Sequence, residues 1–144
     1  MKIVYKARVG ASFNDKQAKV IGVEVERIKN KKGYIKPEFL VFNARSTIHP
    51  LHTFFEWNNT KAGEQYRLHQ ARHLINHIVE IIVVNKKGTE VRSFHSVTCK
   101  DLGKVYVTIS DALKTQDYRN QLLNKSLVAL DNLRNLVELM KTVK

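Results

Sequence analysis

The chain has 144 residues, a length that suits one domain with a modest core, because two domains of half this size would each bury too little surface. Its 43% hydrophobic and 26% charged residues are typical of a globular protein and exclude wholesale disorder. Lys and Arg number 25 against 13 Asp and Glu, and the net charge of +12 favours a polyanionic partner, most often nucleic acid, over a basic surface without a specific ligand.

Cysteine usage and hydropathy indicate the compartment. A single cysteine, Cys99, excludes an internal disulfide and a thiolate metal cluster, and it fits a reducing environment. The first ten residues lack the apolar core of a signal peptide, and no run approaches about 18 apolar residues. We therefore expect a cytoplasmic protein that does not associate with membranes.

The N-terminal segment predicts a strand followed by a helix. Residues 3–9 alternate apolar and polar side chains, which is typical of a half-buried strand, and this strand is expected to end at Gly10. Apolar residues then recur at helical spacing over residues 15–29. Asn14 or Asp15 is the predicted N-cap of this helix.

A basic turn and a long connection follow. The tract KNKKG, residues 29–33, stops the first helix, and Pro37 is a favoured first residue for a second, short helix. Residues 45–59 show no sustained period and predict an irregular connection, which at this length is usually functional or well packed. Its large apolar side chains are interpreted as packing residues rather than base-stacking ones: Leu51, Phe54, Phe55 and Trp57.

The third predicted helix has two different faces. It is capped by Asn59 or Thr60 and is expected to run to about residue 77. Glu64 falls on its apolar stripe with Arg67 at the margin, which predicts a buried ion pair facing inward. The opposite side forms a polar, cation-bearing ridge suited to phosphates and base edges, made of Lys61, Gln65, His69, Arg72 and Asn76.

Strands and a long helix complete the chain. Residues 79–99 predict a β-hairpin with its turn at Gly88, and a further strand is expected over residues 105–109, after Gly103. The C-terminal segment from Ser110 is predicted to be helical with an interruption near Thr115. Its broad apolar stripe fits either core packing or dimerisation, and it consists of Leu122, Leu123, Leu127, Leu130, Leu133, Leu136, Val137 and Met140.

These elements predict an α+β fold in a single domain over residues 1–144, with a helical core, a β-hairpin and a long amphipathic C-terminal helix. Three helices followed by a hairpin is also the order of many winged-helix DNA-binding domains. The predicted 15-residue link before the third helix is far longer than a helix-turn-helix turn. A winged-helix-like arrangement is therefore a weaker expectation than the α+β class.

Histidine spacing raises the question of a metal site. His69, His73 and His77 are four residues apart on one predicted helix, so adjacent pairs have the spacing to share a metal. The glutamate that follows the first histidine of zincin motifs is missing, and the helix offers no Cys or Asp. We expect histidines on a wet face, with no metal and no cofactor.

Catalytic patterns are equally weak. Cys99 has no glycine-rich elbow around it, the acidic residues are scattered singly, and the glycines form no phosphate-binding loop. An enzyme using His52, Glu56 and Arg67 is the least favoured interpretation. Nucleic-acid binding is assigned instead to cationic and polar side chains of the first loop, the third helix and the hairpin: Lys31, Lys32, Lys61, His69, Arg72, Asn76, Lys86, Lys87 and Arg92.

Three segments, GYIKPEFLVFNAR, HPLHTFFEWNNTKAGEQYRLHQARHLI and VYVTISDAL followed by a Leu-rich helix, carry a resemblance. Over about residues 15–142 the chain resembles a family of small uncharacterised phage and prophage proteins. The matching motif residues are Pro50, Leu51, His52, Phe55, Glu56, Trp57, Tyr66, Arg67, Gln70, Ala71 and Arg72. The family pattern has a serine in place of His49, an acidic pair in place of Asn58 and Asn59, and a threonine in place of Lys36.

The resemblance implies a phage or prophage origin and a bacterial host cytoplasm, and it implies no activity. Together with the charge, the leading hypothesis is a non-enzymatic nucleic-acid-binding or regulatory domain, with DNA favoured over RNA. The alternative is a protein-interaction module that modifies a host or phage complex and forms a homodimer through its C-terminal helix.

Overall fold

The computed structural model describes residues 3–59 and 63–143, and it confirms the α+β class. The chain divides into two compact units, Met1–Ile109 (unit 1) and Ser110–Lys144 (unit 2), and the single domain over residues 1–144 remains a prediction. No helix in the described ranges combines the length and hydropathy of a membrane span.

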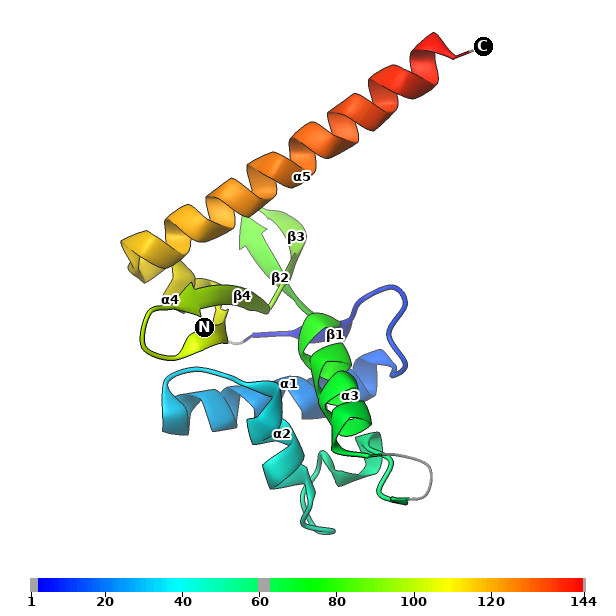
Figure 1. Cartoon of the computed structure of the whole chain (residues 1–144), viewed down its shortest axis with the longest axis vertical. Helices are drawn as coiled ribbons and strands as arrows, with labels where there is room; N and C mark the ends of the chain where they lie inside the picture. The colour runs from blue at the N-terminus through cyan, green and yellow to red at the C-terminus, as the bar shows by residue number, and fades with distance from the viewer. Residues whose placement is uncertain (1–2, 60–62, 144) are drawn as a thin grey trace. The chain divides into compact units, whose positions relative to one another are not determined.

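The elements follow one another in the order shown by the labels and colours of Figure 1. Unit 1 contains β1 (Tyr5–Ala7), α1 (Asp15–Lys32), α2 (Pro37–Ala44), the 3-10 helix η1 (His52–Phe54), α3 (Glu64–Asn76), β2 (Ile78–Val84), β3 (Lys87–Arg92), β4 (Phe94–Cys99) and β5 (Gly103–Thr108). Helix α4 (Ile109–Lys114) begins at the boundary, and α5 (Gln116–Thr142) forms most of unit 2. The predicted interruption near Thr115 is confirmed.

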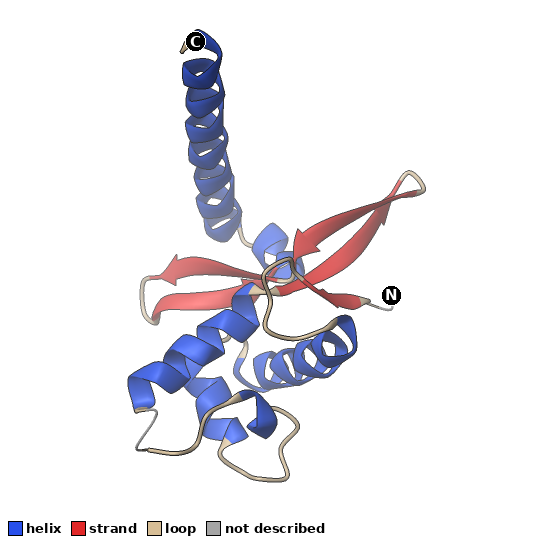
Figure 2. Ribbon diagram, turned by 90° about the vertical axis from the view of Figure 1, so that its right-hand side faces the viewer, coloured by secondary structure: helices blue, strands red, loops and turns tan. Residues whose placement is uncertain are grey.

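The strands form two antiparallel sheets, drawn in red in Figure 2. One sheet has the order β1-β2-β3, and the other is the β4-β5 hairpin. Ile35, between α1 and α2, joins the second sheet through a pair of backbone hydrogen bonds of 2.8 and 2.7 Å with Tyr106. The loop after α1 is thereby tied to β5.

The predicted hairpin differs from the observed one in its turn and its length. Asn85 and Lys86 form a two-residue loop with φ of 52° and 64°, the positive values that a type I′ turn needs at both positions. The turn expected at Gly88 is wrong, because Gly88 lies inside β3 opposite Val83. The chain also changes sheets at the buried Ser93, so β4 pairs with β5 instead of extending β3.

Helix α1 follows its predicted pattern and extends further. The Asn14 side chain accepts from the Gln17 backbone N–H at 2.8 Å, and the Gln17 side chain accepts from the Asn14 N–H, which together make a capping box. The helix ends at Lys32, because Gly33 adopts a φ of 85° and its N–H bonds to the Lys29 carbonyl. The lysines expected on a turn therefore lie on the last turn of α1.

Helix α3 begins later than predicted. Its N-cap is Gly63, so the cap expected at Asn59 is wrong, and Thr60 lies outside the described residues. Three of its apolar residues face the core as predicted, namely Leu68, Ala71 and Ile75. Because α3 begins late, Glu64 is its first residue.

The hydrophobic core of unit 1 lies between the three helices and the strands. Fully buried side chains from α1, α2, α3 and β2 meet there, among them Ile21, Leu40, Ile75 and Ile78. The ring of Tyr5 packs directly on Gly22 of α1, and its hydroxyl donates to Glu26 Oε2 at 2.6 Å. Burial, aided by this glutamate, raises the pKa of Tyr5, so the phenol stays protonated.

The Tyr5–Gly22 contact predicts that Gly22→Ala destabilises unit 1. A Cβ at position 22 would lie closer than 3.0 Å to three ring carbons of Tyr5. Overpacking of this kind costs roughly 1–3 kcal/mol, more than the gain of about 1 kcal/mol in helix propensity. Urea unfolding measures the difference, with Val23→Ala, a change at an exposed position of the same helix, as control. Unchanged or increased stability of the Gly22 variant would contradict the contact.

Candidate nucleic-acid interface

The connector between α2 and α3 is held by the buried guanidinium of Arg67, which is 5% exposed. Its Nε donates to the Glu56 carbonyl at 3.0 Å, and its Nη2 donates to the Trp57 carbonyl at 3.3 Å and to Asn59 Oδ1. A buried charge is costly unless its hydrogen bonds are satisfied, and here backbone and side-chain oxygens satisfy them. Arg67 therefore fixes the path of residues 56–59.

Trp57 is the second anchor of this connector. Its indole Nε1 donates to the His52 carbonyl at 2.8 Å, and its ring stacks on the His52 imidazole with 5.0 Å between centroids and 5° between planes. The Arg67 guanidinium lies 5.1 Å from the indole centroid, a cation–π distance. With Leu51 and Phe55 buried, the interpretation of this segment as a packed connector is confirmed.

Glu64 does not face inward, so this part of the prediction is wrong. Its side chain is 50% exposed, and it accepts two hydrogen bonds of 2.7 and 2.8 Å from Arg45 Nη2, while Arg67 Nη1 lies 3.5 Å away. As the first residue of α3 it has no preceding helical turn to cover it, whereas Arg67 is one turn further in. The Arg45 guanidinium holds the pKa of Glu64 below its usual value.

The polar ridge of α3 is smaller than predicted. His69 and Arg72 are exposed, but Asn76 Oδ1 accepts a 2.5 Å hydrogen bond from Arg92 Nη2, and Arg92 is half-buried. This pair joins the end of α3 to β3. Lys61 lies outside the described residues. Among the described ridge residues that were assigned to nucleic-acid binding, His69 and Arg72 are therefore the exposed ones.

The histidines of α3 make structural contacts. His73 Nε2 accepts the Ser12 backbone N–H at 3.0 Å, and its ring stacks on His77 with 4.0 Å between centroids. Burial, with His77 and His69 nearby, lowers the pKa of His73, consistent with a neutral ring that accepts this hydrogen bond. Within residues 3–59 and 63–143, no three His, Cys, Asp or Glu side chains are grouped to hold a metal ion.

The predicted lysine clusters do not form one surface. Lys31 and Lys32 lie on the last turn of α1, whereas Lys86 and Lys87 lie at the β2–β3 turn. In both Figure 1 and Figure 2 this turn points away from the helices of unit 1, so the two pairs are at separate ends of the unit. The described lysines assigned to nucleic acid are therefore divided between two separate clusters.

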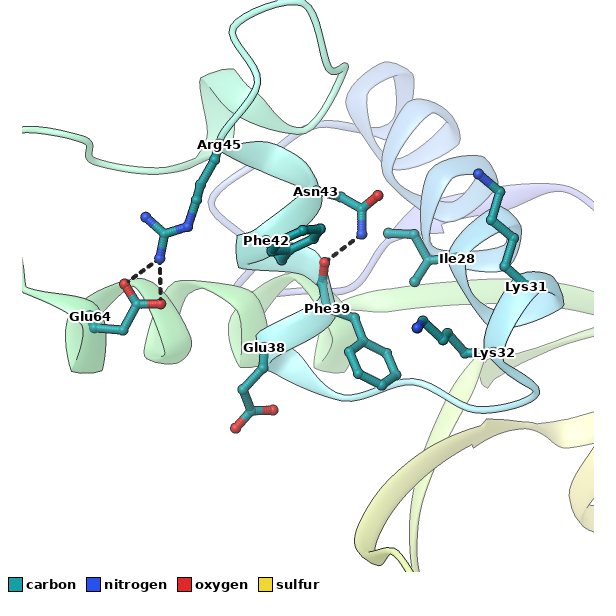
Figure 3. A pocket seen from close by; sticks show the side chains of 9 residues that line it. All are labelled: Ile28, Lys31, Lys32, Glu38, Phe39, Phe42, Asn43, Arg45 and Glu64. Atoms are coloured by element: carbon teal, nitrogen blue, oxygen red, sulfur yellow. Dashed lines mark hydrogen bonds and ion pairs between the residues drawn. The ribbon is translucent and has the colours of Figure 1, made fainter.

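The α1 cluster borders a cavity that the sequence interpretation missed. The cavity has a volume of about 540 Å³ and lies between the end of α1 and α2, as Figure 3 shows. Lys31 and Lys32 stand on one side, the Arg45–Glu64 pair closes the other, and the Phe39 and Phe42 rings lie between them. We call this cavity the α1–α2 groove, and its lining residues are Ile28, Lys31, Lys32, Glu38, Phe39, Phe42, Asn43, Arg45 and Glu64.

Phe42 gives the groove an unusual apolar surface. Its side chain is 76% exposed, although Leu40 and Val41 beside it are buried. Phe39 packs under the Lys32 ammonium, with 5.6 Å from Nζ to the ring centroid, and its carbonyl accepts from Asn43 Nδ2 at 2.7 Å. Helix α2 has eight residues and carries more large apolar side chains than one buried face can accommodate. This excess is the feature of the sequence that could have indicated an exposed ring.

A second cavity of about 310 Å³ continues along α1 and shares Ile28, Lys31 and Asn43 with the groove. Its lining includes Arg27 and His49, whose side chains contact the buried carboxylate of Glu24 at 2.6 and 3.6 Å. Burial lowers the pKa of His49, and the neighbouring Glu24 opposes this effect. The basic edge of the groove therefore extends from Lys32 back to Arg27.

Comparison with known proteins finds no matching family model, no matching curated protein and no matching solved structure. The resemblance to phage and prophage proteins, the winged-helix likeness and the cytoplasmic location therefore remain predictions.

The contacts of Arg67 predict that Arg67→Met destabilises unit 1 by about 2–4 kcal/mol, because the connector oxygens lose their donors. Arg72→Met, one exposed arginine on the same helix, is the control and is expected to cost about 0.5 kcal/mol or less. Chemical denaturation followed by tryptophan fluorescence measures both, since Trp57 reports directly on the connector. Equal losses in the two variants would contradict the anchoring role.

Proposed function

We propose that the chain is a non-enzymatic nucleic-acid-binding protein that takes single-stranded segments, with DNA favoured over RNA, into the α1–α2 groove. The observation that carries this proposal is that Lys31 and Lys32 line the same cavity as the Phe39 and Phe42 rings. Proteins that bind single strands combine cations that follow the phosphates with aromatic rings on which bases stack.

The distribution of charge supports a polyanionic ligand for unit 1. This unit contains 19 Lys and Arg against 9 Asp and Glu, so it carries most of the chain's excess positive charge. The two acids that line the groove stand away from Lys31, and Glu64 is paired with Arg45 (Figure 3). We therefore place the phosphates along the Lys31 and Lys32 side and a base over Phe42.

A protein-interaction module is the second candidate function. It is favoured by α5, where none of residues 116–142, all of them described, is buried. The two functions use different units and do not exclude each other.

The proposal predicts that Lys31→Gln/Lys32→Gln weakens binding to a fluorescent single-stranded oligonucleotide and flattens its salt dependence. Each phosphate contact on a single strand contributes about 0.7 to the slope of log K against log salt, so the slope falls by up to about 1.4. Fluorescence anisotropy over a salt series measures both quantities. Lys16→Gln/Lys19→Gln removes the same charge from an exposed part of the same helix outside the groove. If both double variants behave alike, the groove is not the site.

Phe42 tests the stacking contribution separately. Phe42→Ala is expected to weaken single-strand binding by about 1–3 kcal/mol, roughly 5- to 150-fold, while the salt slope stays unchanged. Phe42→Tyr keeps the ring and is expected to keep the affinity. Tyr66→Ala, which removes a half-exposed ring that does not line the groove, is the matched control. An unchanged affinity of Phe42→Ala would show that bases do not stack there.

A further inference from the structure

One side of α5 forms an uncharged strip, and α5 contains no buried residue. With Leu123 at heptad position a, nine residues over three heptads occupy positions a, d and g, and eight of them are apolar. We call these residues the α5 strip: Leu122, Leu123, Ser126, Ala129, Leu130, Leu133, Leu136, Val137 and Met140. Leu123, Leu130 and Leu133 are 56%, 54% and 60% exposed.

The charged residues of the helix avoid this strip. From residue 120 to the end of α5 they occupy positions b, c and e, and they are Lys125, Asp131, Arg134, Glu138 and Lys141. Glu138 and Lys141 make an ion pair of 3.8 Å within the helix. Since most helical stability in proteins comes from packing an amphipathic face, a 27-residue helix with this strip needs a covering surface.

We propose that the α5 strip is covered by the α5 strip of a second copy of this chain, in a parallel two-stranded coiled coil. The net charge of unit 2 supports a second copy as the partner. Unit 2 contains 6 Lys and Arg against 4 Asp and Glu, so the two pairing helices carry little net charge and repel each other only weakly. The strip also offers no charge that would select an acidic or a basic partner.

The residues at positions e and g, and Ser126 as the single polar residue of the α5 strip, agree with the parallel orientation. In parallel register, g residues face e residues of the other helix, so Ala129 and Leu136 meet the aliphatic stems of Arg134 and Lys141 rather than like charges. Ser126, at position d, meets Ser126 of the second copy. In the antiparallel arrangement centred on the strip, Ser126 would face Val137, which leaves the hydroxyl against an apolar side chain.

The mass of the full chain in solution tests whether a second copy is bound. Light scattering coupled to size exclusion at tens of micromolar protein is expected to give about twice 16.6 kDa. Leu130→Glu is expected to give the mass of one chain, and Leu139→Glu, with 59% exposure on the outer face at position c, is expected to stay at two. The carboxylate introduced by Leu130→Glu would lie four residues before Arg134, a favourable helical pair, so circular dichroism should show that the helix survives.

A wild-type mass of one chain, or of three or more, would overturn the proposal, as would an equal response of the two variants. The orientation is tested in a Cys99→Ser background. Ser126→Cys is expected to form a disulfide between two chains under mild oxidation, while Val128→Cys on the outer face stays unlinked. A dimer in which Ser126→Cys does not crosslink would overturn the parallel register.

Discussion

The buried guanidinium of Arg67 is the interaction on which the arrangement of the helices in unit 1 depends. The segment between α2 and α3 contains no regular element beyond η1 among its described residues, so its backbone groups need partners from elsewhere. Arg67 supplies donors to two consecutive carbonyls, and Trp57 covers the guanidinium while bonding back to His52. The Arg67 side chain thus provides these carbonyls with the hydrogen bonds that helical backbone N–H groups would otherwise provide.

The shape of the α1–α2 groove follows from this anchor. With the connector fixed, the end of α2 lies beside the start of α3, and Arg45 reaches Glu64 with two hydrogen bonds. That pair closes one end of the groove, and the C-terminal turn of α1 closes the other with Lys31 and Lys32. Phe42 remains exposed because the buried side of α2 is already filled by Leu40, Val41 and Ala44.

Local signals in the sequence were sufficient for several elements, but the site depended on contacts that periodicity cannot reveal. The capping pattern at Asn14 predicted the start of α1, because caps act within a few residues. The hairpin turn was misplaced because the glycine cue at Gly88 competed with Asn85 and Lys86, which adopt positive φ without glycine. Helical spacing put Glu64 on the apolar stripe, whereas the late start of α3 and the distant Arg45 decide its surroundings.

Charge and apolar surface are separated along the chain, so the two proposed associations would respond to salt in opposite ways. The proposed phosphate contacts to unit 1 would weaken steeply as salt rises, because counterions compete for the same charges. The proposed helix pairing removes apolar surface from water, and salts such as sulfate strengthen that burial. A dimer would present two grooves to one strand, so the second contact would form at a raised effective concentration. Two weak grooves would then hold a long strand more tightly than a short one, without a further contact in either unit.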